Sequence, residues 1–162
     1  MNIQSAIIVG TDILKNKCIQ TAQLDTEILM AKALGKDRKY IVLNNNKYLK
    51  DKNLKLFEKL INERASRKPI AYLINKKFFW NFEFFVTSDT LIPRPDTELI
   101  IEQILKLTKH KSKINILDIG VGSGCILLTI LKERKNFYGT GIDISKKCIN
   151  ISNKNAKNLK VE

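Results

Sequence analysis

The sequence predicts an α/β fold in three parts: a small N-terminal helical bundle at residues 1–76, a β-hairpin linker at 77–90, and the start of an open parallel α/β sheet at 91–162. Three patterns support this prediction. Apolar residues recur at helical spacing in the first part, and aromatic residues cluster in the second. In the third part, a glycine-rich turn joins a short apolar strand to an amphipathic helix.

The composition is that of a globular chain with a large positive charge. Hydrophobic residues make up 44% of the 162 residues, and 29 Lys and Arg stand against 16 Asp and Glu, a formal charge of +13. The excess is mostly lysine and is spread over both halves, whereas nucleic-acid-binding proteins concentrate Arg, Lys and aromatic residues on one face. We therefore expect no direct role in nucleic-acid binding, and the charge gives only a weak indication of an acidic partner.

Three further features concern the compartment. No apolar run approaches the roughly 20 residues that span a bilayer, and the N-terminus lacks the basic and apolar blocks of a secretory signal. Cys18, Cys125 and Cys148 lie far apart and form no CxxC pair, which disfavours a zinc site and a disulfide framework. We expect a cytoplasmic protein without a membrane segment or a metal.

The helical part contains three amphipathic stretches, at 3–14, 24–34 and 54–64. Gly35 follows the second stretch and is expected to cap the C-terminus of its helix. The side chains expected to face the core from that helix are Leu24, Ile28, Ala31 and Leu34.

The linker reads as a short hairpin. Residues 77–80 and 82–86 are rich in aromatic and β-branched residues and are separated by Asn81. A nucleobase-stacking platform would interleave basic residues on the same face, and here only Lys76 and Lys77 flank the run. We therefore interpret these aromatic residues as a hydrophobic hinge.

Residues 91–98 open the third part with a helix start. Two prolines fix the backbone there, and Asp96 and Glu98 lie where the helix dipole favours negative charge. The apolar stripe expected to be buried comprises Ile100, Ile104 and Leu107.

The remaining segment has the order strand, glycine turn, helix, strand, acid, helix. We expect a strand at 114–119, a turn at 120–124, a second strand at 136–142 that ends before Asp143, and a final helix capped by Ser145. The helix after the turn should point four residues inward: Ile126, Leu127, Ile130 and Leu131.

The spacing in the turn favours one kind of ligand. Glycine lets the backbone approach a ligand because no Cβ intrudes, and Asp143, 19 residues beyond Gly124, can accept hydrogen bonds from ribose hydroxyls. Cys125 stands near the place of the third glycine of a dinucleotide fingerprint, and the turn lacks the lysine of a P-loop. Asp118 would repel a pyrophosphate but suits a cationic, methionine-type ligand. The candidate binding residues are Gly120, Val121, Gly122, Ser123, Gly124 and Asp143.

Residues 117–124, Leu-Asp-Ile-Gly-Val-Gly-Ser-Gly, resemble motif I of the class I S-adenosylmethionine-dependent methyltransferases. Nearly the whole chain resembles the HemK-type protein-(glutamine-N5) methyltransferases that modify peptide chain release factors. The most specific similarities are at 67–74, 77–80 and 91–98. The last segment, with Pro-Arg-Pro-Asp-Thr-Glu, differs from the Pro-Arg-Ser-Pro of the ribosomal-protein glutamine methyltransferases. That branch is therefore the alternative, and the release-factor branch is favoured.

The resemblance implies a Rossmann-like methyltransferase domain that binds S-adenosyl-L-methionine, with residues 120–124 at its methionine end and Asp143 at its ribose. It implies methyl transfer to the glutamine side-chain amide of a Gly-Gly-Gln motif in a peptide chain release factor, which the helical part would help to hold. The complete protein would be a cytoplasmic monomer. Arg94, Asp96 and Glu98 either shape the active site or only start a helix.

One departure from the family is large. The reactive element of the family, Asn-Pro-Pro-Tyr, is absent, because the only prolines are Pro69, Pro93 and Pro95, all upstream of the turn. The chain stops at Val161-Glu162, where a third strand should begin, so we expect a domain truncated after two strands, with strand 114–119 left uncovered at an edge. We expect no catalytic residue in this chain and a catalytically incomplete protein.

A fragment, a split or frameshifted gene and a decayed gene each account for this sequence. The competing functions are a non-catalytic release-factor-binding module or remnant, then a nucleic-acid-binding protein. A nicotinamide-dependent dehydrogenase is argued against by Cys125.

Overall fold

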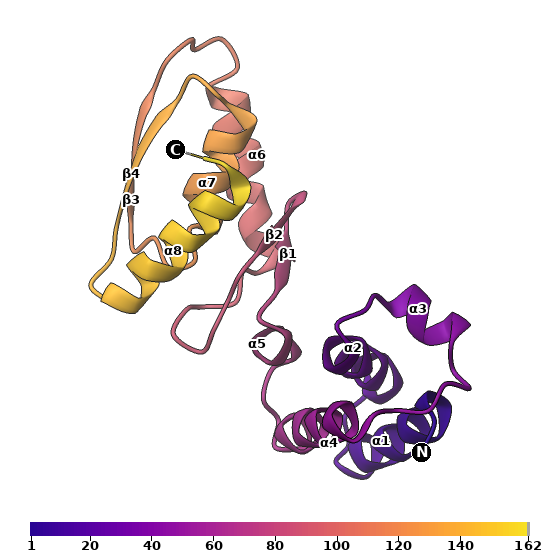
Figure 1. Ribbon diagram of the computed structural model, residues 1–162. Helices are drawn as coiled ribbons and strands as arrows, with labels where there is room; N and C mark the ends of the chain where they lie inside the picture. Colours follow the sequence, from indigo (N-terminus) through magenta and orange to yellow (C-terminus); the bar gives the residue numbers. More distant parts are fainter. Residues whose placement is uncertain (162) are drawn as a thin grey trace. The chain divides into compact units, whose positions relative to one another are not determined.

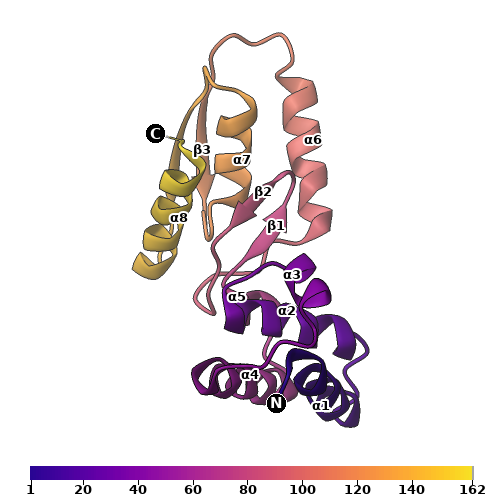
Figure 2. The same ribbon diagram turned by 45° about the vertical axis from the view of Figure 1, so that its right-hand side comes forward.

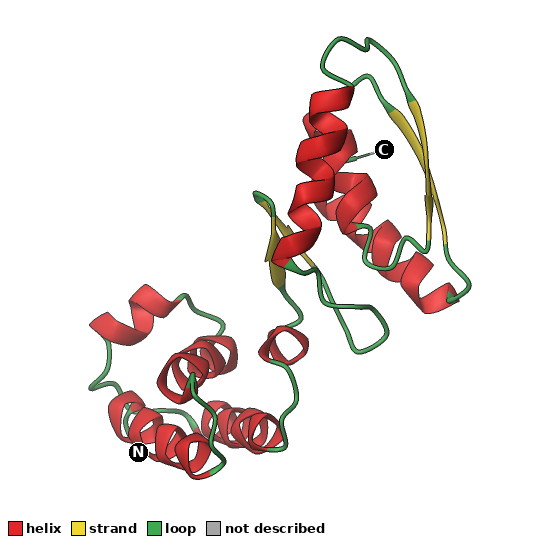
Figure 3. Cartoon of the chain, turned by 180° about the vertical axis from the view of Figure 1, so that it is seen from behind, coloured by secondary structure: helices red, strands yellow, loops and turns green. Residues whose placement is uncertain are grey.

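The computed structural model describes residues 1–161 and divides into two compact units, Met1–Ile74 and Asn75–Glu162. Glu162, the last residue of the expected 91–162 domain, lies outside the described residues. The predicted fold class is confirmed: helices form the first unit, and the second contains a hairpin followed by parallel strands that are connected through helices (Figures 1 and 3).

The first unit is a bundle of five helices. They are α1 (Ile3–Asn16), α2 (Ala22–Leu34), α3 (Arg38–Leu43), α4 (Asp51–Ala65) and α5 (Ile70–Ile74). Local capping sets several of their ends: the Ser5 backbone N–H donates to the Asn2 side chain at 2.8 Å, and the Tyr40 N–H donates to Asp37 at 2.8 Å. Gly35 ends α2 in the left-handed region, with φ of 62°, as the sequence predicts.

The buried face of α2 differs from the predicted one. Leu24 is 42% exposed, and Ile28, Ala31 and Leu34 are only partly buried. The residues that face the core are instead Ala22, Asp25, Thr26, Leu29, Met30 and Ala33. The physical reason is Asp25, whose carboxylate accepts a hydrogen bond from Arg64 Nε of α4 at 2.6 Å, so that a charged residue occupies the core-facing side.

The hairpin prediction is confirmed in the second unit. β1 (Lys77–Phe79) pairs with β2 (Phe82–Phe84) in antiparallel register. Phe79 and Phe84 are buried on the same side, and their ring centroids lie 6.1 Å apart in an edge-to-face arrangement. The turn residue Trp80 donates its backbone N–H to the Glu98 carboxylate at 2.7 Å, which attaches the hairpin to the start of the next helix.

A single 3-10 turn, η1 (Pro95–Thr97), leads into α6 (Glu98–Leu107), and here the predicted buried face is wrong. Ile101 is the buried residue of this helix, whereas Ile100 and Leu107 are exposed and Ile104 is only partly buried. The helix packs on α7 (Figure 2), and Ile101 is completely buried. One residue of rotation, about 100°, is enough to turn the predicted stripe away from the contact.

The α/β part follows the predicted order. It comprises β3 (Asn115–Ile119), α7 (Cys125–Glu133), β4 (Tyr138–Ile142) and α8 (Lys146–Leu159). β3 and β4 are parallel, with Asp118 opposite Gly141 and Ile119 opposite Ile142. Figures 1 and 2 show α7 between this sheet and α6.

Two glycines in β4 allow α7 to approach the sheet closely. A Cβ at Gly139 would lie 2.6 Å from Leu127 Cδ1, and one at Gly141 would lie 2.7 Å from Val121 Cγ2. Of the four residues expected to point inward from α7, Leu127 and Ile130 are fully buried and the other two are partly buried. The side of β3 away from α7 is uncovered, as expected, with Leu117 59% and Ile119 76% exposed.

No helix between residues 1 and 161 is both long and apolar enough to cross a membrane. Within the same part of the chain, no group of three or more His, Cys, Asp or Glu side chains could hold a metal ion.

Candidate functional site

The candidate site lies at the carboxyl ends of β3 and β4, where the glycine turn (residues 120–124) connects β3 to α7. The backbone N–H groups of Gly120 and Val121 both donate to the Ile142 carbonyl, at 2.8 and 3.0 Å. These bonds extend the pairing of the two strands into the turn and bring the turn beside Asp143. Parallel strands place their carboxyl ends at one edge, which is where open α/β sheets bind ligands.

Asp143 connects the second strand to the turn. Its Oδ2 accepts the Gly122 N–H at 2.9 Å, and its Oδ1 accepts the Ser145 N–H at 2.8 Å. These two hydrogen bonds hold the pKa of the Asp143 carboxyl below its ordinary value, and the one from Ser145 has the larger effect. The group is therefore an ionised acceptor at neutral pH, and each oxygen keeps a further lone pair for a ligand.

The turn presents bare backbone to solvent at two of its glycines. Gly120 has a φ of 84°, and a Cβ built on it would meet no atom within 4 Å. At Gly122 the nearest atom to such a Cβ is the Gly120 carbonyl oxygen, at 3.9 Å. The space over both residues is therefore open, although their positive φ values would strain any residue with a side chain.

Gly124 is required for a different reason. A Cβ on this residue would lie 2.6 Å from Ser152 Oγ and 2.8 Å from Leu128 Cδ1. The close contact is with α8 on one side and with the first turns of α7 on the other. Gly124 therefore fixes how the turn packs on its two helices.

The side chains of Val121 and Ser123 are buried, so a ligand at the turn could reach only their backbone groups. Cys125, which follows the turn, has a thiol whose pKa is raised by burial. A thiol that resists ionisation is a poor nucleophile, so Cys125 is not suited to nucleophilic catalysis.

Asp118 adds a second carboxyl group at the end of β3. Burial raises its pKa, the Leu127 backbone N–H lowers it, and the charge of Asp143 raises it further. Two neighbouring carboxyl groups produce a negative potential that favours a cationic ligand. A positive charge nearby would, in turn, favour the ionised form of Asp118.

One residue that the sequence analysis did not select is central to the site. Asn155 of α8 is fully buried and hydrogen bonds with the backbones of Phe85 and Ser123. The signal was present in the sequence, since Asn155 falls on the same helical face as Cys148 and Ile151. A polar residue on an otherwise apolar face is a candidate for a buried hydrogen-bonding role.

The connector (residues 85–94), which joins the hairpin to η1, is attached to α8 at two other points. Lys147 Nζ donates to the Asp89 carboxylate at 2.8 Å, and Cys148 Sγ donates to the Asp89 carbonyl at 3.2 Å. At the far end of this segment, Arg94 and Asp96 are exposed, and Glu98 accepts the Trp80 N–H. The contact of Glu98 is with the hairpin, so its observed role is structural.

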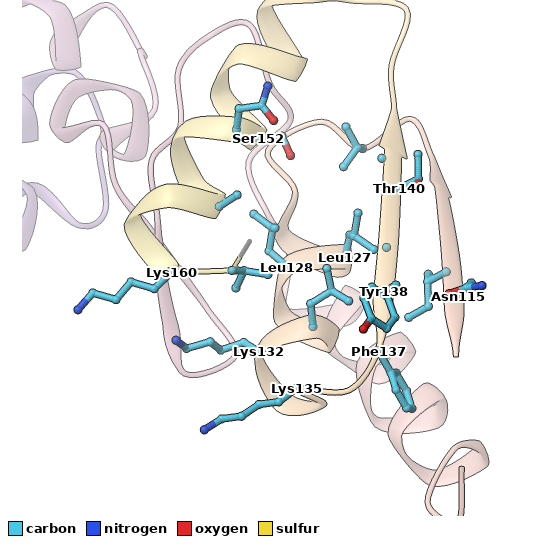
Figure 4. Close-up of a pocket in the computed structure, with 18 of the residues that line it drawn as sticks. Asn115, Leu127, Leu128, Lys132, Lys135, Phe137, Tyr138, Thr140, Ser152 and Lys160 are labelled. Atoms are coloured by element: carbon cyan, nitrogen blue, oxygen red, sulfur yellow. The ribbon is translucent and has the colours of Figure 1, made fainter. Parts of the chain in front are cut away.

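A separate cavity of about 920 Å³ lies between α7, β4 and α8 (Figure 4). Apolar residues such as Leu127 and Leu128 line it, together with Lys132, Lys135 and Lys160. Among residues 1–161, no Asp or Glu lines this cavity. The groups suited to a cationic ligand with hydroxyls therefore lie at the glycine turn and not in this cavity.

Each unit matches a known family model. Residues 5–74 match the family model described as the PrmC N-terminal domain, and residues 94–161 match that of the methionine biosynthesis protein MetW. The chain is 41% identical over 146 residues to the release factor glutamine methyltransferase of Buchnera aphidicola subsp. Baizongia pistaciae, covering 90% of this chain and 53% of the relative.

Two further relatives with the same name agree. That of Leptospira interrogans is 38% identical over 90% of this chain and 51% of its own length. That of Caulobacter vibrioides is 33% identical over 98% of this chain and 55% of its own. Along nearly its whole length this chain is similar to proteins named release factor glutamine methyltransferase, and it spans about half the length of the curated relatives it matches.

Proposed function

We propose that this chain carries the S-adenosyl-L-methionine-binding part of a release factor glutamine methyltransferase. The binding residues are Gly120, Val121, Gly122, Ser123, Gly124 and Asp143. The observation that carries the proposal is the hydrogen bond from the Gly122 N–H to Asp143, beside an open glycine backbone. The names of the relatives support the methyltransferase class.

The residues of the site fit this cofactor in charge and in shape. Asp143 is an ionised acceptor suited to the two ribose hydroxyls. The open backbone at Gly120 and Gly122 leaves room for the methionine end, and Asp118 adds negative charge for the positive sulfonium. When bound, the cofactor supplies an electrophilic methyl group for the side-chain amide nitrogen of the glutamine in a Gly-Gly-Gln motif.

The proposal assigns a role to each part of the chain. Residues 1–76 hold the peptide chain release factor, 77–90 form the linker, and 91–162 bind the cofactor in the cytoplasm, where release factors act. The amide nitrogen is a poor nucleophile, so orientation by bound groups has to supply most of the rate. Because the sequence lacks Asn-Pro-Pro-Tyr, we expect the 162-residue chain to bind the cofactor without transferring its methyl group.

Calorimetric titration of the 162-residue chain with S-adenosylmethionine tests the proposal. We expect saturable binding, and Asp143→Ala should weaken it about 10- to 100-fold, because hydrogen bonds to a charged group contribute about 1.5–3 kcal/mol. Asp12→Asn, which neutralises an exposed carboxylate of α1 in the other unit, is the matched control and should bind like the wild type.

Absence of cofactor binding by a folded chain would reject the proposal. If such a chain still bound a release factor, the non-catalytic docking module would be the correct function, and the PrmC N-terminal match at 5–74 favours that alternative. Binding to a ribosomal protein in preference to a release factor would move the chain to the ribosomal-protein branch.

A further inference from the structure

Asn155 forms a three-way junction inside the second unit. Its Oδ1 accepts the Phe85 backbone N–H at 2.7 Å. Its Nδ2 donates to the Phe85 carbonyl at 2.9 Å and to the Ser123 carbonyl at 2.8 Å. One side chain therefore joins α8, the connector and the glycine turn.

The side chain of Asn155 is fully buried, which makes these bonds energetically important. The primary amide has the acceptor and the two N–H donors that this junction uses. Without the amide, one N–H and two carbonyl groups of the backbone would be left unpaired in the interior, and each unpaired buried group is costly.

A second contact from α8 reaches the same part of the turn. Ser152 lies one helical turn before Asn155, and its Oγ is the atom that a Cβ on Gly124 would meet at 2.6 Å. Two successive residues of the turn, Ser123 and Gly124, are thus held against one face of α8. The Gly124 N–H, which completes the Ser123 peptide group, donates to the Val121 carbonyl at 2.7 Å.

We infer that Asn155 is a positioning residue for the cofactor-binding turn, an inference that rests on the proposed function. By holding the Ser123 carbonyl, it sets the orientation of the Ser123–Gly124 peptide and so the conformation of the open backbone at Gly122. By holding Phe85 with the same amide group, it makes the connector move with the turn. The site then includes the connector as a wall whose position depends on Asn155.

Amide hydrogen exchange, measured by NMR on the ligand-free 162-residue chain, tests the positioning role without requiring the cofactor. In Asn155→Ala, we expect the Gly122 and Gly124 amides to exchange at least 10-fold faster, with little change at Ile130 in the core of α7. Asn158→Ala removes an exposed asparagine from the same helix and should leave the exchange rates at the turn unchanged. Faster exchange that is uniform across the second unit, or no change at the turn, overturns the inference.

A measurement on the wild type avoids the risk that Asn155→Ala fails to fold. S-adenosylhomocysteine should slow exchange at Gly122 and also at Phe85, because Asn155 connects the two. Slower exchange at Gly122 with no change at Phe85 contradicts the coupling.

The affinity for S-adenosylhomocysteine tests whether Asn155 also affects cofactor binding. At a temperature where both proteins are folded, Asn155→Ala should bind it at least 10-fold more weakly than Asn158→Ala, and equal affinity overturns the positioning role. If the wild type binds no cofactor, the proposed function fails and the ligand-free exchange rates still decide how Asn155 acts on the turn.

Discussion

The helical core of the first unit and the strand β3 of the second bury their apolar residues to very different degrees. In the first unit, Leu14, Leu29 and Ile61 belong to one core cluster and are almost completely buried. In the second unit, Leu117 and Ile119 lie in a strand, yet more than half of each side chain is exposed. A helix satisfies its backbone internally and needs only one covered face, whereas a strand needs neighbours on its edges and covering on its faces.

The difference predicts unequal stabilities. The described sheet of the α/β part has two strands, β3 and β4, and a two-stranded sheet is marginal without helix packing, which here covers one face. We expect the second unit to unfold at a lower denaturant concentration than the first. Trp80, the only tryptophan of the sequence, lies in the second unit, so its fluorescence reports on that unit alone.

The largest effect should come from the core of the helical unit. Phe57 of α4 is buried against Gly10 of α1, and Phe57→Ala should cost about 3–5 kcal/mol of the free energy of unfolding. Circular dichroism at a helical wavelength should show the loss, while the Trp80 transition stays in place. Leu56→Ala, at an exposed neighbouring position, should change neither transition much. An equal shift of the Trp80 transition would mean that the two units unfold together.

The buried ion pair of the helical unit should give the next largest effect. Arg64→Met leaves the Asp25 carboxylate buried without its partner, which should cost about 3 kcal/mol in the circular dichroism transition. The double variant Asp25→Leu with Arg64→Met should recover much of this loss, because it removes the unpaired charge. Glu63→Gln, which breaks the exposed pair with Lys68, is the control and should have little effect. A single variant as mild as this control would show that the pair is not needed.

In both units, the sequence predicts where most elements lie but not which face of a helix is buried. The existence and order of the longer elements follow from local spacing, and so do the cap at Gly35 and the hairpin around Asn81, whereas the short helix α5 was not predicted. The direction in which a helix faces does not, because it depends on the partner. The core-facing side of α2 contains Asp25, and a hydrophobicity pattern counts this residue as a surface residue until Arg64 is seen beside it.

The same limit applies to the site. That Asp143 should lie near the glycine turn follows from the parallel strands, and the structure places its carboxylate on the Gly122 N–H. The role of these residues in binding stays a prediction. The position of Asn155 on an apolar helix face could be read from the sequence, but its partners could not. They are backbone groups of Phe85 and Ser123, 70 and 32 residues away, and every residue carries such groups.

Leu117 and Ile119 form an uncovered apolar face of the sheet. Exposed apolar strand residues promote association, so Leu117→Asn combined with Ile119→Asn should reduce concentration-dependent self-association in sedimentation experiments. Stability should change by less than about 1 kcal/mol, because both side chains make few contacts within the unit. Leu43→Asn with Val42→Asn, at exposed positions of α3, is the matched control. Unchanged self-association of the sheet variant would show that this face does not drive it.

The smallest effect should come from Asp118. Because burial raises the pKa of this carboxyl group, ionisation disfavours the folded state, and stability is lost as the pH rises through the raised pKa. Asp118→Asn should therefore raise the midpoint of the Trp80 thermal transition at pH 7 by roughly 1–3 °C. At a pH below the ordinary carboxyl value, where both proteins are neutral at this position, the two midpoints should coincide.

The stability contributed by Asp143 should change with pH in the opposite direction to that of Asp118. Backbone N–H groups lower its pKa, so its contribution to stability is present above the ordinary carboxyl value and is lost as the pH falls through the lowered pKa.

Asp118→Asn should have opposite effects on stability and on cofactor binding, since it removes a negative charge that favours a sulfonium. The variant should lose more affinity for S-adenosylmethionine than for the uncharged thioether S-adenosylhomocysteine. Equal losses for the two ligands would show that Asp118 does not recognise the positive charge.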